Sequence, residues 1–321
     1  MQLTDRIRQI NEHIADHGID SAMVLFNISR ETARRYSRSA REEKEETEPE
    51  KFDREQSAIK QLKERFTIQE LENIANGRAL NPEQINKPII NFDGEDVIIG
   101  YCTDTHIGSK YFHQHYWESF LEECYKQNVS MIMHGGDLID GMSNRPDHIY
   151  SLTHIGYSAQ MDYAAEMLAM TDLPINIIDG NHDRYGIKSG GLMVVEDVAN
   201  RLSHVTYLGH DEGDIVINGT VWRLWHGEDG SSYATSYRLQ KIIESFTGGE
   251  KPQALFAGHT HKQLYMFDRN VHVVSGGAMC SQSAWMRSKK LANHAGFHII
   301  RATIAENEIK SFSATFYPFY K

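Results

Sequence analysis

The chain has 321 residues, a formal net charge of −11, three cysteines and 40% hydrophobic residues. This composition can bury one core of about 220 residues plus a smaller module. No apolar run approaches the roughly 18 residues of a membrane span, and the N-terminus has no apolar signal core, so we expect a cytoplasmic protein without membrane contact. The cysteines lack C-x-x-C spacing, and we interpret them as reduced structural thiols rather than a disulfide set or a zinc site: Cys102, Cys124 and Cys280.

Residues 1–45 have the pattern of a small all-α domain. Four apolar residues recur at spacings of 4, 3 and 4 and share one helix face: Leu3, Ile7, Ile10 and Ile14. Gly18 is expected to end this helix. A short helix over residues 20–25 and a turn at residues 26–28 are expected after it.

Ser29 is a good N-cap for a second longer helix that opens at Arg30. The segment Ile28–Tyr36 resembles the recognition helix of a helix-turn-helix, which enters the major groove of DNA. Residues 29–41 carry five arginines against one acidic residue. We expect four of them to contact nucleic acid: Arg30, Arg34, Arg35 and Arg38. The alternative is a helical docking or oligomerisation module, which would make the protein a homo-oligomer.

Residues 46–92 have the composition of a charged linker. The stretch 42–50 carries six acidic residues and one basic residue. Thr67–Glu70 has the form of a capping box and predicts one short helix. Because local charge rather than net charge governs phosphate contact, the acidic total does not exclude DNA as a partner.

Residues 93–321 alternate short strands with helices, which predicts an α/β domain with strands buried on both faces. Helices are expected at residues 116–127, 156–170, 192–202 and 234–246. Late strands are expected at residues 263–267, 271–275, 296–304 and 308–316.

Potential metal ligands follow the apolar runs of this domain in a regular order. They are Asp104, His106, Asp137, Asn181, His226, His259 and His261. In an extended segment, residues two apart point the same way, so Asp104 and His106 can reach one ion, and His259 and His261 also share a face. The carboxylate of Asp137 has two oxygens and can bridge two ions. Ligands beyond strand ends lie where α/β folds usually bind their ligands.

The order of these motifs resembles the calcineurin-like metallophosphoesterase superfamily: D-x-H, G-D-x-x-D, G-N-H-D, a lone His-Gly and G-H-x-H. The resemblance covers roughly residues 97–304 and implies a four-layer αββα sandwich, beside the small all-α N-terminal domain. It implies two divalent cations, with manganese expected first and iron or zinc compatible with the same donors. It also implies phosphoester cleavage by attack of a metal-bound hydroxide.

The same resemblance assigns a proton-transfer role to His182 and an orienting role to Asp140. A histidine paired with a carboxylate has a raised pKa, which suits a general acid. Arg184 could clamp a phosphate oxygen, although a surface arginine is an equal alternative. His226 is preferred over His210 as a ligand because it ends a strand-like run and precedes a glycine. Other histidines, His148 among them, are expected to be ordinary loop, surface or sheet residues.

Two details distinguish between branches of the superfamily: one points to DNA and the other argues against protein phosphatases. Asp104–Gly108 is similar to the D-x-H-[IL]-G of nucleases that process DNA double-strand breaks. Asp140 is followed by Gly141 and Met142, whereas protein phosphatases of the superfamily usually continue with Arg-Gly. We therefore expect a DNA nuclease. The alternatives are an enzyme acting on a nucleotide or other small phosphoester, with the N-terminal module used for oligomerisation, and a DNA-binding regulatory protein with an idle metal site.

Overall fold

The structure, a computed structural model, describes residues 3–34, 87–145, 147–227, 234–247 and 249–320. The chain divides into two compact units, Met1–Leu80 and Asn81–Lys321. Several expectations fall outside the described residues: Arg35, Arg38, the helix at Thr67–Glu70 and most of the linker.

The N-terminal unit begins with α1 (Leu3–Phe26), which is two helices joined at a non-helical Gly18 with φ of 79°. The predicted break at Gly18 is therefore confirmed. Ile10 and Ile14 are buried together with Ala22 and Ala33, so the predicted apolar face of the first helix packs against the two later helical segments.

Ser29 caps the next helical segment as predicted, because its Oγ accepts from the backbone N–H of Thr32 at 3.1 Å. Residues 30–34 are helical as far as the description reaches. The guanidinium of Arg30 pairs with the carboxylate of Asp20 across the two segments, whereas the side chain of Arg34 is exposed. One arginine of the module thus already has an internal partner.

The C-terminal unit contains two six-stranded sheets. The first has the spatial order β12 (Glu308–Pro318), β11 (Gly296–Ala305), β2 (Asp96–Cys102), β3 (Met131–His134), β4 (Ile175–Asp179) and β5 (Val205–His210). The second has the order β1 (Ile89–Ile90), β6 (Glu212–Ile217), β7 (Thr220–Trp225), β8 (Ala254–Ala257), β10 (Val271–Gly276) and β9 (Gln263–Asp268). Strands β2 to β5 are parallel neighbours, and β8 lies parallel between β7 and β10.

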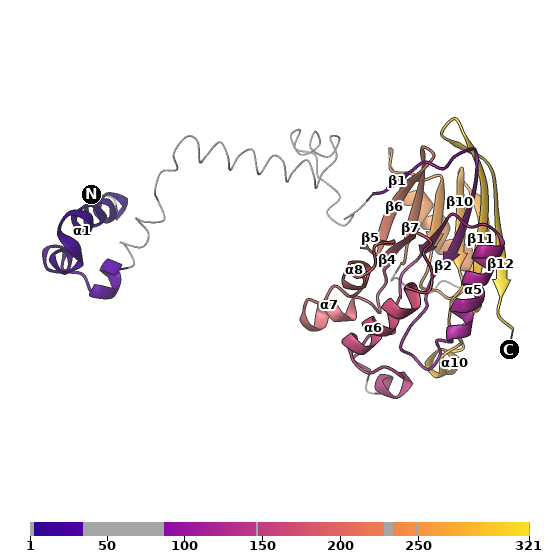
Figure 1. The fold of residues 1–321 in the computed structure, drawn as a ribbon, viewed down its shortest axis with the longest axis horizontal. Coiled ribbons are helices and arrows are strands. Elements are labelled where there is room, and N and C mark those ends of the chain that lie inside the picture. The colour runs from indigo at the N-terminus through magenta and orange to yellow at the C-terminus, as the bar shows by residue number, and fades with distance from the viewer. Residues whose placement is uncertain (1–2, 35–86, 146, 228–233, 248, 321) are drawn as a thin grey trace. The chain divides into compact units, whose positions relative to one another are not determined.

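Four helices cover the outer faces of the sheets: α5 (Gln114–Lys126), α6 (Tyr157–Leu168) and α8 (Val194–Ala199) on the first, and α9 (Thr235–Ser245) on the second. The short helices α7 (Tyr185–Gly190) and α10 (Ala284–Ser288) and a 3-10 turn at His148–Ser151 lie in the connections. Figure 1 shows α5, α6 and α8 beside the first sheet. The four helices and four late strands predicted from the sequence are all present, with ends shifted by a few residues.

Three buried clusters define the layers. One packs α5, α6 and α8 against the first sheet and includes Trp117 and Phe120. A second lies between the sheets, around Tyr101 and Trp222. The third joins α9 to the second sheet through Leu239. This arrangement is the predicted αββα sandwich.

The expected boundary at residue 93 is too late. Ile89 and Ile90 form β1, which pairs in parallel with Val216 and Ile217 of β6. The end of the expected linker is therefore part of the second sheet. Among the described residues, no helix is both long and apolar enough to cross a membrane.

Candidate metal centre

The candidate ligands all follow the carboxyl ends of parallel strands. Asp104 and His106 follow β2, Asp137 follows β3 and Asn181 follows β4. His226 directly follows β7 of the other sheet, and the two remaining histidines follow β8. Both sheets thus present their ligands at one shared edge, as expected for an α/β fold.

The backbone of these loops is strained. Five of the candidates adopt left-handed φ angles, which non-glycine residues rarely do: Asp104 (53°), His106 (49°), Asp137 (52°), His259 (68°) and His261 (55°). Each such residue costs on the order of 1–3 kcal/mol and persists only where its surroundings enforce it. Five of the seven candidate ligands therefore hold a backbone conformation that their surroundings must enforce.

One group of side chains gathers around Asp104. Its Oδ1 lies 3.2 Å from His261 Nε2 and 4.0 Å from His106 Nε2. The two imidazole nitrogens are themselves 3.2 Å apart. Asp137 Oδ2 lies 3.7 Å from His106 Nε2, so Asp137 borders this group.

A second group shares Asp137. Its Oδ2 lies 3.3 Å from His226 Nε2, and that nitrogen lies 3.2 Å from Asn181 Oδ1. His259 Nδ1 is 2.8 Å from the same amide oxygen. A Cβ at Gly180 would lie 2.2 Å from Asp137 Oδ1 and 2.7 Å from His226 Nε2, so only glycine fits there. All seven predicted ligands are thus brought together, in two groups that meet at Asp137.

The outer nitrogens of three histidines are held by hydrogen-bond acceptors. His226 donates from Nδ1 to the carbonyl of Gly135 at 2.7 Å. His261 donates from Nδ1 to Asn293 Oδ1 at 2.7 Å, and His106 donates from Nδ1 to Asp140 Oδ1 at 3.1 Å. In each neutral ring the inward Nε2 is therefore left with a lone pair, which is how metal-binding histidines are usually oriented.

The inward atoms then face one another as acceptors. The unprotonated Nε2 atoms of His106 and His261 lie 3.2 Å apart. The unprotonated Nε2 of His226 faces oxygens of Asp137 and Asn181. Asp104 Oδ1 is fully buried and has no hydrogen-bond partner among the described residues. Lone pairs crowded in this way need positive charge between them, so the donor set fits cations in both groups.

The pKa values of the same side chains show that the site requires positive charge. Burial lowers the pKa of His226, but Asp137 and Asp104 raise it to about 10. Burial also opposes the charge on His106, yet Asp140 and Asp137 raise its pKa to about 9. Conversely, burial raises the pKa of Asp104, but His261 lowers it to about 2. Without metal, the protein compensates its buried carboxylates with protons on these histidines.

Asp140 orients His182 in a different way from the one predicted. The carboxylate of Asp140 accepts from His106 Nδ1 at 3.1 Å and from His148 Nε2 at 3.0 Å. His182 donates instead from Nδ1 to the main-chain carbonyl of Asp140 at 2.8 Å, and its distance to the carboxylate is 3.6 Å. Burial lowers the pKa of His182, although Asp137 and Asp140 raise it in part. The expected rise in its pKa is therefore wrong for the metal-free protein.

The expectation that His148 is an ordinary surface or loop histidine is also wrong. This residue is buried at Asp140, and its ring centroid lies 6.4 Å from that of His182. The backbone N–H of Ser143 donates to its Nδ1 at 3.2 Å, which leaves Nε2 as the donor to Asp140.

Asp183 ties the loops of the site together, a role that the sequence pattern did not predict. Its buried carboxylate accepts from the backbone N–H groups of Leu138 (3.1 Å), Ile139 (2.9 Å) and Gly180 (2.8 Å). Burial, with the charge of Asp137, raises the pKa of Asp183 to about 7. Its place in G-N-H-D was the only available indication.

Arg184 and His210 belong to a separate network around Asp179. Arg184 Nη1 lies 2.9 Å from Asp179 Oδ1, and its other nitrogen lies 3.4 Å from Asp211. His210 Nδ1 lies 2.6 Å from Asp179 Oδ2. A structural role is thus the simpler account of Arg184, and the structure places His226 rather than His210 beside Asp137.

A cation–aromatic pair comes from two segments that leave the centre. The guanidinium of Arg145, five residues after Asp140, lies 4.8 Å from the ring centroid of Trp285. The Trp285 ring belongs to α10 and is 47% exposed. An exposed indole beside a guanidinium can stack a nucleobase while the guanidinium contacts a phosphate.

Comparison with known proteins gives one curated relative and a set of solved structures. The DNA polymerase II small subunit of Methanothermobacter thermautotrophicus is 20% identical over 238 residues, which cover 60% of this chain and 49% of that protein. This chain therefore spans about half the length of that relative.

Two of the similar solved structures are phosphoesterases. An archaeal phosphodiesterase is 17% identical, with a TM-score of 0.43, 69% of this chain covered and 100% of the other. Yfce, a phosphoesterase from E. coli, is 16% identical, with a TM-score of 0.39 and coverage of 68% and 98%.

The family model of the calcineurin-like phosphoesterase superfamily domain matches residues 97–292, which is more than half of the chain. The matched range contains all seven candidate ligands, His182 and Asp140. The chain belongs to the calcineurin-like phosphoesterase superfamily, whose members hydrolyse phosphoesters with divalent metals.

Proposed function

We propose that this protein is a two-metal phosphodiesterase that cleaves DNA. The observation that carries the proposal is the pair of ligand groups that share Asp137. Asp104, His106 and His261 would hold one ion, Asn181, His226 and His259 the other, and Asp137 would bridge them. When bound, such a pair supplies Lewis acidity at the phosphoryl oxygens and a nucleophile at neutral pH.

His182 is the residue that we propose to handle the leaving-group proton. Its Nδ1 is committed to the carbonyl of Asp140, so Nε2 is the atom that can exchange a proton with substrate. Its backbone N–H donates to Asp137 Oδ1 at 2.9 Å, which fixes the residue beside the proposed bridging carboxylate. Asp140 and His148 act as positioning residues around this imidazole.

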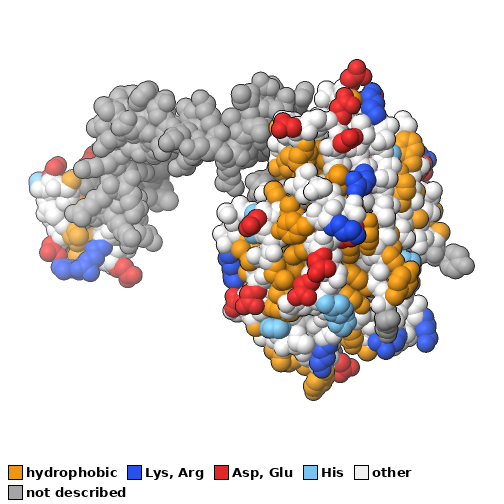
Figure 2. Space-filling view, turned by 45° about the vertical axis from the view of Figure 1, so that its right-hand side comes forward, with side chains coloured by type: hydrophobic (Ala, Val, Ile, Leu, Met, Phe, Trp, Pro, Cys, Tyr) orange, Lys and Arg blue, Asp and Glu red, His pale blue; other side chains and the backbone are white. Residues whose placement is uncertain are grey.

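Three observations favour DNA as the substrate. The curated relative is named as a subunit of a DNA polymerase. The N-terminal unit has a capped helix after a packed one, as a helix-turn-helix does, and it carries an exposed Arg34. The Arg145–Trp285 pair offers a platform for an unstacked base. By contrast, basic and acidic side chains are interspersed on the face of the C-terminal unit in Figure 2, so that face offers no continuous basic surface.

A second candidate is a phosphodiesterase for a small molecule, with the N-terminal unit used for assembly. It is favoured by Val24 and Leu25, which are 85% and 62% exposed. Exposed apolar side chains on a small helical unit suit contact with another protein. The ion pair of Arg30 with Asp20 also neutralises one of the arginines that are expected to contact DNA.

The test is a metal panel on the purified full chain. Chelator-treated protein would be supplied with manganese, zinc or iron and given linear, circular and single-stranded DNA, beside a bis-aryl phosphodiester. We expect metal-dependent cleavage of DNA and of the aryl ester, its loss in Asp137→Asn, and its retention in Asp172→Asn, which changes an exposed carboxylate. Cleavage of the aryl ester alone would favour the small-molecule candidate, and no metal-dependent hydrolysis of either would refute both.

A further inference from the structure

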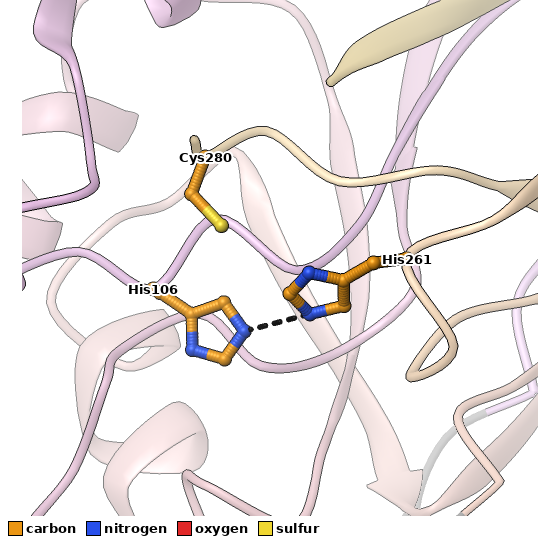
Figure 3. Close-up of side chains that lie close together, drawn as sticks. All are labelled: His106, His261 and Cys280. Atoms are coloured by element: carbon orange, nitrogen blue, oxygen red, sulfur yellow. Dashed lines mark hydrogen bonds between the residues drawn. The ribbon is translucent and has the colours of Figure 1, made fainter. Parts of the chain in front are cut away.

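Cys280 lies inside the first ligand group, although its sequence context predicts only a packing role. It follows the end of β10 by four residues, and β10 runs parallel to β8, the strand that precedes His261. The sulfur of Cys280 and ligand nitrogens of His106 and His261 all lie within 4.8 Å of one another. Figure 3 shows the thiol directed toward the two imidazoles.

Independent contacts fix the position of this cysteine. The backbone N–H of Met279 donates to the carbonyls of Thr103 and Asp104, both at 3.1 Å, which joins the cysteine segment to the Asp104 loop. On the other side, Asn293 donates from Nδ2 to the carbonyl of Cys280 at 3.0 Å, while its Oδ1 holds His261. The side chain is 3% exposed, so the thiol is shielded from solvent.

A second observation indicates that a ligand belongs in this group. Asp104 Oδ1 is fully buried, lacks a hydrogen-bond partner among the described residues, and lies 3.2 Å from His261 Nε2. The two imidazoles and the thiol form an N and S donor group, and the Asp104 carboxylate adjoins it through His261 Nε2. The other group, with Asn181, His226 and His259, has no such sulfur in the described part of the chain.

We propose that Cys280 is a thiolate ligand of the ion held by Asp104, His106 and His261, and that it makes this site selective for a thiophilic ion such as zinc over manganese. Sulfur ligands favour zinc and iron, whereas manganese prefers carboxylate, carbonyl and water oxygens. The inference rests on the proposed function, because it assumes that the group holds a metal. At this position zinc would thus take the place of the manganese that the family resemblance implies.

The chemistry is a simple exchange at sulfur. The S–H bond breaks, the proton leaves to solvent, and the sulfur electron pair forms the bond to the cation. No oxidant or reductant is required. Binding at this site therefore releases one more proton than binding to the histidines and carboxylates alone, because thiolate rather than thiol is the ligand.

Cobalt(II) is a suitable probe, because it can replace zinc and its bond to a thiolate gives a charge-transfer absorption in the near ultraviolet. The full-length metal-free protein would be titrated with cobalt, and bound metal would be counted by elemental analysis. The variants are Cys280→Ser and Cys280→Ala. The matched control is Cys124→Ala, a buried cysteine in the core between α5 and the first sheet.

We expect the thiolate band in the wild type and in Cys124→Ala, and its loss in both Cys280 variants while cobalt remains bound. Zinc affinity at this site should fall at least by the roughly 10–100-fold that loss of a supporting partner costs, with manganese affinity little changed. Two cobalt ions bound without the band would refute the thiolate ligand and leave the proposed function standing. A failure of the wild type to bind any divalent metal would refute both.

Discussion

Asn293 offers a sharp test of how the centre is built, because one side chain supports two of its parts. Its Oδ1 accepts from His261 Nδ1 at 2.7 Å, and its Nδ2 donates to the carbonyl of Cys280 at 3.0 Å. Each hydrogen bond contributes about 0.5–1.5 kcal/mol net, so Asn293→Ala should lower the free energy of unfolding of the metal-free protein by about 1–3 kcal/mol. For a domain of this size that corresponds to a fall in Tm of roughly 2–12 °C.

The same substitution should also weaken metal binding. Once His261 loses its acceptor, its ring is free to turn and to change tautomer, which typically costs about 10–100-fold in affinity, or about 1.4–2.7 kcal/mol. Asn293→Asp keeps an acceptor for His261 but loses the donor to Cys280. It should therefore be destabilised but should bind metal within a few fold of wild type.

Calorimetric titration with zinc and thermal unfolding with and without metal would measure both effects. Asn200→Ala, at the exposed end of α8, is the matched control. Zinc binding by Asn293→Ala as tight as in wild type, or an equal loss of affinity in Asn293→Asp and Asn293→Ala, would refute this role of Asn293.

Four further predictions concern single side chains. His182→Ala should keep both metals but slow DNA cleavage by roughly 10²–10⁴-fold, with a much smaller effect on an activated aryl ester; equal losses on both substrates would exclude a proton-transfer role. Arg34→Ala should reduce the salt dependence of DNA binding by about one unit of slope if it contacts one phosphate, with aryl ester hydrolysis unchanged; an unaltered slope would count against the DNA-binding role. Trp285→Ala should weaken binding of single-stranded DNA by about 1–3 kcal/mol, the contribution of one stacked base. An unchanged affinity would contradict the proposal that Trp285 stacks a base. Burial lowers the pKa of His298 to about 3, against about 6.5 in the unfolded chain, so stability is complete above pH 6.5 and declines as the pH falls toward 3. Between pH 7 and 4.5 the wild type should lose roughly 3 kcal/mol more than His298→Phe in denaturant unfolding, and parallel losses would contradict this.

The sequence predicted the fold and the grouping of the ligand candidates because both depend on local patterns. Asp104 and His106 do lie close together, but both have left-handed φ angles in the loop after β2, so the extended geometry assumed for this pair is wrong although the grouping is right. The carboxyl ends of parallel strands then meet at one edge whatever the loops between them do. The helix break at Gly18 and the cap at Ser29 are also local, and both are present.

The missed features depend on contacts between residues far apart in sequence. Nothing local shows that the carboxylate of Asp140 goes to His106 and His148 and leaves its carbonyl to His182. Cys280 lies 19 residues after His261 in the sequence, and the pairing of β10 with both β8 and β9 brings them together. Its position after a strand end was a usable indication, but the absence of C-x-x-C spacing favoured the packing interpretation.

The acceptor-rich interior of the site has a consequence for the amount of protein that a cell would maintain. Asp104 and Asp137 are almost fully buried, and their counter-charges without metal are protons on His106, His226 and His261. Cations that displace these protons bind only the folded chain, so they add about 2.7 kcal/mol of stability at a free concentration one hundred times the Kd. Metal scarcity would then increase the unfolded fraction that proteases remove. The supply of metal would therefore control the abundance of this protein as well as its rate of turnover.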